Sequence, residues 1–254
     1  MIKRRIYQYL KNISFKNKIL VKTHKNFCKI FYFKKERIFR KIADNKLGIE
    51  RVLSDYQGLT WYIKRLNKNK KKIIKKFVKN KNFSYLDTFQ IDGFQAKSWD
   101  SLEKNYKKIK KVYFQYRRVF PKNKYTSIHG DLTLDNIIFK KKEIFIIDWE
   151  FFGSKKNFYG YDLAYLFLSS LCLPFVSKKK YSLVDEKLFI SLWRMLKELN
   201  VDRQIIDDPF YFFEKNIKKD RLLKKNYLLS KSKFFPFLVK SSYKKKIYKL
   251  INDI

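Results

Sequence analysis

The sequence predicts an α+β fold in two lobes, with a small strand-rich N-terminal lobe over residues 1–95 and a larger, mainly helical lobe over residues 96–254. In the first lobe, short runs of β-branched and aromatic residues are typical of strands. After residue 95, apolar residues recur every three or four positions, which favours helices. Asp92-Gly93 is a strong turn signal where the pattern changes. A chain of 254 residues that is 45% hydrophobic can form a sizeable core.

The N-terminal lobe is expected to contain several strands and one helix. Strands are predicted over Lys18–His24, Phe27–Phe33 and Arg37–Asp44, and a strand or strand pair over Phe83–Phe94. A helix is predicted over Gly48–Leu66, because its apolar residues share one face, namely Val52, Tyr56, Leu59 and Ile63. The lysine run Lys68–Lys76 is interpreted as a solvated connector.

The C-terminal lobe is expected to contain helices and one small hairpin. A helix over Asp100–Phe120 opens with Asp100 and Glu103 in capping-box spacing. Its apolar stripe comprises Leu102, Tyr106, Ile109, Tyr113 and Tyr116. Ile137–Phe139 and Glu143–Ile147 are predicted to pair as a hairpin, and helical texture returns over Ser182–Asn200 and Phe212–Leu229. The apolar run Leu163–Val176 is too short to span a membrane and is expected to be a buried core helix.

The net charge of +38, from 61 basic and 23 acidic residues, permits two interpretations. One is an anionic partner such as nucleic acid, a membrane surface or a phosphorylated ligand. The other is compositional drift of an AT-rich coding sequence, which we favour because the lysines are spread along the whole chain. Without a nucleic-acid-binding motif, we expect no specific nucleic-acid partner. Peripheral contact with an anionic membrane surface stays open.

The cysteines and the N-terminus favour a cytoplasmic protein. Cys28 and Cys172 lie far apart and form no CxxC pair, so neither a disulfide framework nor a zinc site is indicated. The basic N-terminus is not followed by a continuous apolar segment, which argues against a signal peptide.

A dense group of polar residues lies between Ser127 and Gly153. His129, Asp131 and Asn136 precede a predicted strand, and Asp148 ends the next strand, twelve residues after Asn136. A strand–loop–strand arrangement can bring these side chains to one rim. A carboxylate and an amide oxygen can hold Mg²⁺, and a second carboxylate can accept the proton of a hydroxyl group. These are the parts that a phosphoryl-transfer site needs.

The segments HGDLTLDN and IIDWE together resemble the signature of the aminoglycoside phosphotransferase and choline kinase family. The resemblance implies a bilobal protein-kinase-like fold and a kinase that phosphorylates an alcohol group. Gly130 stands where protein kinases have arginine, Trp149-Glu150 follow Asp148, and no Ala-Pro-Glu segment follows, which favours the small-molecule branch. The later segment GYDLAYL resembles that family's downstream motif and makes Asp162 its structural aspartate. The specific motifs cover only Ser127–Leu166.

The resemblance implies a role for each residue of the motif and the use of ATP and Mg²⁺. Asp131 would be the catalytic base, and Asn136 and Asp148 would bind Mg²⁺ that bridges the ATP phosphates. His129 would brace the catalytic loop. Glu150 would either support the site from behind or be an exposed residue at the strand end.

The same fold implies a basic residue on a strand that reaches the nucleotide phosphates, steadied by a helix acid. Lys41 and Arg40 are the candidates for the base, on opposite strand faces, and Asp55 and Glu50 are the candidates for the acid. We prefer Lys41 and Asp55, but the sequence does not decide which of the two bases pairs with which of the two acids. No glycine-rich phosphate loop is present, and Asn26 would occupy the corresponding turn. The segment Asp87–Phe94 would be the hinge between the lobes and would present backbone groups to adenine.

The phosphate acceptor is expected to be a hydroxyl on a small molecule or on a surface-glycan sugar. Few acidic residues lie outside the motif, so a cationic acceptor is disfavoured. The alternatives are a non-catalytic kinase-like protein that binds nucleotide and regulates a partner, or a basic nucleic-acid-binding module. The choice between ATP and GTP and the oligomeric state are left open.

Overall fold

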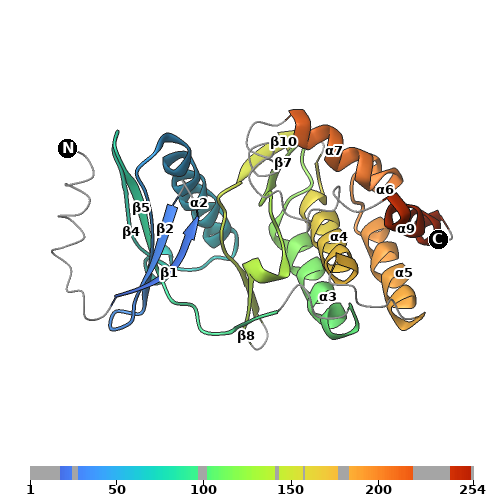
Figure 1. Ribbon diagram of the computed structural model, residues 1–254, viewed down its shortest axis with the longest axis horizontal. Coiled ribbons are helices and arrows are strands. Elements are labelled where there is room, and N and C mark those ends of the chain that lie inside the picture. Colours follow the sequence, from blue (N-terminus) through green and yellow to red (C-terminus); the bar gives the residue numbers. More distant parts are fainter. Residues whose placement is uncertain are drawn as a thin grey trace. The chain divides into compact units, whose positions relative to one another are not determined.

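The computed structural model describes residues 18–24, 28–96, 102–140, 143–156, 158–176, 183–219 and 241–252. The chain divides into two compact units, Met1–Asp92 and Gly93–Ile254 (Figure 1). Strands dominate the described part of the first unit, and helices dominate that of the second. This confirms the predicted α+β class. The turn with Asn26 and the Asp100 end of the predicted capping box lie outside the described residues.

The first unit is built on a five-stranded antiparallel sheet. Its strands lie in the order β1-β2-β3-β5-β4. Their bounds are Lys18–His24 for β1, Cys28–Phe33 for β2, Ile38–Ala43 for β3, Ile74–Lys79 for β4 and Ser84–Phe89 for β5. Aromatic and aliphatic side chains of β2, β3 and β5 form a core cluster, comprising Phe31, Phe33, Ile38, Ile42 and Tyr85.

Helix α2 (Lys46–Arg65) links β3 to β4 and contacts β3, β4 and β5 (Figure 1). The Asn45 side chain caps its start by accepting a hydrogen bond from the backbone N–H of Gly48. Most of the predicted apolar face is buried. Tyr56 is only half-buried, and its ring stacks on Phe77 with the ring centroids 4.0 Å apart.

The lysine run expected to be a solvated connector is in part a strand. A short 3-10 helix covers Lys70–Lys72, and β4 then begins at Ile74. Ile73 and Ile74 are both buried, whereas Lys75 and Lys76 are exposed. The expectation was wrong for the part of the run from Ile73 onward, because an edge strand can carry lysine toward solvent while its aliphatic residues pack on the sheet.

The second unit contains two small antiparallel sheets. Strands β6 (Phe94–Gln95), β8 (Ile137–Lys140) and β9 (Glu143–Ile146) form one sheet. Strands β7 (Tyr125–Ile128) and β10 (Gly153–Lys156) form the other. The antiparallel pairing of β8 with β9 confirms the predicted hairpin.

Helices make up the rest of the described second unit. They are α3 (Leu102–Val119), α4 (Tyr161–Val176), α5 (Leu183–Glu198), α6 (Arg203–Asp207), α7 (Pro209–Lys219) and α9 (Ser241–Asn252). Helix α3 contacts α4 and α5 (Figure 1). Every side chain described in α4, from Tyr161 to Ser170, is buried, which confirms a core helix there. No helix among the described residues is both long enough and apolar enough to cross a membrane.

Candidate active site

The loop after β7 carries the predicted catalytic residues, and the first turn of α4 holds it in place. The backbone N–H groups of His129 and Gly130 donate to the two carboxylate oxygens of Asp162, at 2.8 Å and 2.9 Å. Asp162 is fully buried, and this burial raises its pKa to about 7, although the two hydrogen bonds oppose the rise. Asp162 therefore fixes the backbone of the loop at His129 and Gly130.

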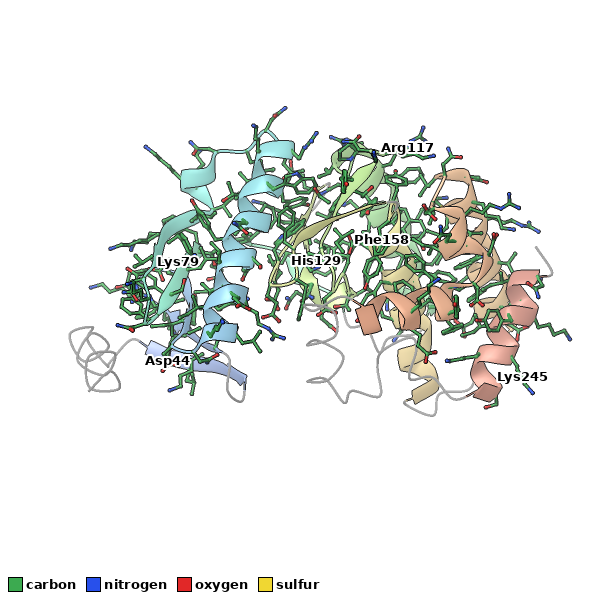
Figure 2. The ribbon with its side chains drawn as sticks, turned by 90° about the horizontal axis from the view of Figure 1, so that it is seen from above. Asp44, Lys79, Arg117, His129, Phe158 and Lys245 are labelled. Atoms are coloured by element: carbon green, nitrogen blue, oxygen red, sulfur yellow. The ribbon has the colours of Figure 1, made fainter. Side chains whose placement is uncertain are left out.

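The His129 ring connects the loop to the strand that ends at Asp148. The backbone N–H of Asp131 donates to His129 Nδ1 at 3.3 Å, and His129 Nε2 lies 2.9 Å from the carbonyl oxygen of Ile147. A carbonyl oxygen can only accept and a backbone N–H can only donate, so these two contacts assign the proton to Nε2 and leave Nδ1 as the acceptor. The ring is thus a neutral imidazole, packed edge-on against Trp149. His129 is labelled in Figure 2.

Gly130 has a backbone conformation and surroundings that favour glycine. Its φ of +88° lies in the left-handed region that side chains disfavour. A Cβ at this position would lie 2.7 Å from Phe151 Cβ and 2.8 Å from the Phe151 carbonyl oxygen. The close approach of the loop to Phe151 therefore explains why glycine separates His129 from Asp131.

Asn136 is hydrogen-bonded to the backbone of both Asp131 and Ile147. Its amide Nδ2 donates to the backbone carbonyl of Asp131 at 2.8 Å. The backbone carbonyl oxygen of Asn136 accepts a hydrogen bond from the backbone N–H of Ile147 at 2.9 Å. Ile147 immediately precedes Asp148. Because the amide nitrogen points to Asp131, Asn136 Oδ1 points away from that carbonyl and can accept a cation.

Asp148 has a left-handed backbone with φ of +64° and lies two residues after the last residue of strand β9, Ile146. Non-glycine residues in this conformation are uncommon and occur frequently at functional sites. Asn136 Oδ1 and the Asp148 carboxylate are hard oxygen ligands of the type that Mg²⁺ prefers. No cluster of three or more His, Cys, Asp or Glu side chains that could hold a metal occurs within the described ranges. A magnesium ion here would complete its shell with phosphate oxygens and water.

In the first unit, Lys41 and Asp55 form an ion pair. Lys41 Nζ lies 2.5 Å from Asp55 Oδ2, and both side chains are largely buried. Glu50 lies five residues earlier on α2, which places it on another side of the helix, where it lines a hollow with Asp44 and Lys79. The structure thus brings together the two residues that we preferred.

Arg40 points to the other face of β3 and joins a buried pair that sequence reasoning missed. Arg40 Nε and Nη2 donate to the two carboxylate oxygens of Asp87, each at 2.6 Å. The guanidinium also lies over the rings of Phe33 and Tyr85. The available signal was an acid inside the apolar strand SYLDTF, where Asp87 is opposite Arg40 in the register.

The profile of the phosphotransferase enzyme family matches residues 34–224, about three quarters of the chain. The chain belongs to this family. Membership confirms the prediction of a kinase that acts on an alcohol group. No curated protein sequence matches this phosphotransferase.

Solved structures of similar fold cover most of the phosphotransferase. The aminoglycoside-3'-phosphotransferase of type VIII has a TM-score of 0.52 at 12% identity and covers 76% of this chain and 90% of its own. An amicoumacin kinase in complex with AMP-PNP, Ca²⁺ and amicoumacin has a TM-score of 0.53 at 13% identity, covering 99% and 94%. The aminoglycoside phosphotransferase APH(3'')-Id from Streptomyces rimosus scores 0.50 at 13% identity, covering 76% and 92%. These likenesses confirm the predicted kinase-like fold.

The remaining acids of the phosphotransferase motif differ in burial. Asp135 and Glu143 are exposed. Glu150 is only 7% exposed, so the alternative of an exposed strand-end residue is wrong. A turn follows Asp148, with a hydrogen bond from the Phe152 N–H to the Trp149 carbonyl oxygen, and Trp149, Glu150 and Phe151 are each buried.

Proposed function

We propose that this phosphotransferase transfers the γ-phosphoryl group of ATP, in the presence of Mg²⁺, to a hydroxyl group of a small molecule or of a surface-glycan sugar. The observation that carries the proposal is the position of Asn136. One asparagine bonds to the Asp131 carbonyl through its side chain and to the residue before Asp148 through its backbone. Asn136 thereby links the proposed base, Asp131, to the segment that carries the proposed metal ligand Asp148.

In the proposed reaction, Asp131 accepts the proton of the acceptor hydroxyl as its oxygen attacks the γ-phosphorus. A bond forms between that oxygen and phosphorus, the bond to the β-phosphate oxygen breaks, and ADP leaves. Asn136 and Asp148 would hold the Mg²⁺. When bound, the ion neutralises negative charge on the phosphates. His129 keeps the backbone of Asp131 in place through its Nδ1.

Lys41 is proposed to contact the nucleotide phosphates, with Asp55 holding its ammonium group in position. The 2.5 Å ion pair supports this choice over Arg40, whose guanidinium is engaged by Asp87. We propose the first unit as the nucleotide-binding lobe and the second as the catalytic and acceptor-binding lobe. The segment Asp87–Phe94 would act as the hinge. We place the reaction in the cytoplasm, in agreement with Cys28, a buried cysteine that forms no disulfide among the described residues.

The acidic residues of the C-terminal helices favour an acceptor that is not a cation. Glu186 pairs with Lys246 at 3.0 Å, and Asp207 pairs with Arg203 at 3.3 Å. Asp208 accepts hydrogen bonds from the Tyr211 backbone N–H and the Tyr248 hydroxyl. These carboxylates have partners within the protein, whereas a site for a cationic ligand needs acidic or aromatic walls. A hydroxyl group of a neutral or anionic sugar suits this surface better as the phosphate acceptor.

The test is transfer of labelled phosphate from ATP with Mg²⁺ to a panel of acceptors. The panel contains choline, ethanolamine, aminoglycosides, amicoumacin, simple sugars and a glycan-lipid extract. Asp131→Asn should keep nucleotide binding and lose turnover, and Asp148→Ala should lose magnesium-dependent nucleotide binding. Asp135→Asn, which changes an exposed acid of the same loop, is the matched control and should retain activity.

The outcomes separate the proposal from its alternatives. Transfer to one acceptor that the Asp131→Asn variant cannot perform would establish the reaction and name the acceptor class. Unchanged turnover in either active-site variant would contradict the assigned roles. Magnesium-dependent ATP binding without transfer to any acceptor would instead favour a nucleotide-binding regulatory protein.

A further inference from the structure

The positive charge is distributed unevenly among the described helices, contrary to what uniform compositional drift predicts. Helix α3 carries seven basic residues and one acid, Glu103. Helix α5, which packs against it, carries three basic and three acidic residues. Lysine and arginine are thus concentrated on one of two neighbouring helices of similar length.

The exposed side of α3 combines basic residues with an aromatic ring. At 100° per residue, Lys104, Lys107, Phe114 and Arg118 fall on the side opposite the buried residues Ile109 and Tyr116. All four are exposed, and Phe114 is 53% exposed near the middle of the row. A phenylalanine at such a position has no role in the core of the protein.

The same chemistry continues beyond the end of α3. Lys122 and Lys124 are exposed, and Tyr125, the first residue of β7, is 60% exposed. Arg117, which Figure 2 labels, is exposed beside Arg118. The α3 basic surface is defined as Lys104, Lys107, Phe114, Arg117, Arg118, Lys122, Lys124 and Tyr125.

We propose that the α3 basic surface binds the anionic face of a phospholipid bilayer. Each lysine or arginine near an anionic leaflet raises the binding constant about fivefold. Aromatic rings prefer the headgroup level, where Phe114 and Tyr125 would insert between the basic side chains. The inference does not depend on the proposed phosphoryl transfer, because it concerns binding alone.

Nucleic acid fits this surface less well. Single-stranded nucleic acid is bound in basic grooves with aromatic stacking platforms, whereas the outer side of a helix is convex. Specific base readout relies mainly on bidentate arginine contacts, but four of the six basic residues here are lysines. The charge complementarity therefore favours lipid headgroups.

The experiment measures sedimentation of the full chain with vesicles at physiological salt. One set contains phosphatidylcholine alone, and the other contains phosphatidylcholine with phosphatidylserine. We expect binding only to the second set. Lys107→Glu/Arg118→Glu should weaken binding about twenty-five-fold or more, from the fivefold contribution of each charge. Phe114→Ser should weaken it severalfold without a change in charge.

The matched control is Lys71→Glu/Lys72→Glu, which makes the same change in net charge at exposed residues of the first unit. It should bind almost as well as the original chain, because neither lysine belongs to the α3 basic surface. Circular dichroism and melting temperature verify that each variant is folded. An equal loss in the control, or no binding to phosphatidylserine vesicles, would overturn the proposal. Binding of single-stranded RNA alone, lost in Lys107→Glu/Arg118→Glu, would also overturn it and assign the surface to nucleic acid.

Discussion

Replacement of Gly130 by alanine should destabilise the protein and remove most of its activity. The left-handed φ of +88° costs an alanine about 1–2 kcal/mol. The new Cβ would also lie 2.7 Å from Phe151 Cβ and 2.8 Å from the Phe151 carbonyl oxygen, far inside normal contact distance. Relief of such overpacking typically costs a further 1–3 kcal/mol. The free energy of unfolding should therefore fall by about 2–5 kcal/mol.

Activity should fall by more than the loss of stability explains. Gly130 lies between His129 and Asp131, so a shift that relieves the overlap moves the proposed base. A misplacement of about 1 Å can lower turnover about a hundredfold. Urea unfolding gives the stability, and phosphate transfer by the fraction that remains folded gives the activity.

Gly153→Ala is the matched control for this variant. Gly153 pairs with Ile128, the last residue of β7, and Ile128 directly precedes the loop that begins at His129. No atom lies within 4 Å of a Cβ added there, and its φ is not in the left-handed region. This substitution should leave stability unchanged or raise it by about 0.5 kcal/mol. If both alanine variants have the same stability as the original chain, the close contact with Phe151 is not what requires glycine.

Three further predictions concern ion pairs and protonation. Lys41→Ala should lower kcat/KM for ATP ten- to a hundredfold, because a charged hydrogen bond contributes about 1.5–3 kcal/mol; an unchanged KM and kcat would exclude its proposed contact with phosphate. Arg40→Ala should destabilise by about 3–5 kcal/mol by leaving the Asp87 carboxylate buried without its partner. In urea unfolding, Arg40→Ala/Asp87→Ala should be more stable than the sum of the single effects, and simple additivity would contradict the pairing. Burial raises the pKa of Asp162 from 3.8 to about 7, so between pH 3.8 and 7 the folded chain keeps a proton that the unfolded chain releases. The free energy of unfolding should therefore fall in this range as pH rises, by about 1.4 kcal/mol per pH unit. Asp162→Asn should lack this slope when unfolding is followed against pH, and identical slopes would refute the shift.

Local pattern was sufficient to predict most elements. The hairpin of β8 and β9 was predicted because its two apolar runs are short, contain β-branched residues and are separated by lysines. Helices α2 and α3 were predicted because their apolar residues recur at helical spacing. Strand β4 was missed because its lysines dominate the local composition, and its burial depends on pairing with β5, which lies later in the chain.

The sequence by itself determined the family, the fold class and the residues of the HGDLTLDN and IIDWE segments, because these follow from residue identity and spacing. The tertiary structure decided how these residues contact each other. It paired Lys41 with Asp55 and Arg40 with Asp87, a choice that depends on which face of β3 meets which neighbouring element. It also placed Asp162 under the loop and directed the His129 ring to Ile147. Such contacts join residues far apart in the chain, so the packing of the elements decides them and local sequence does not.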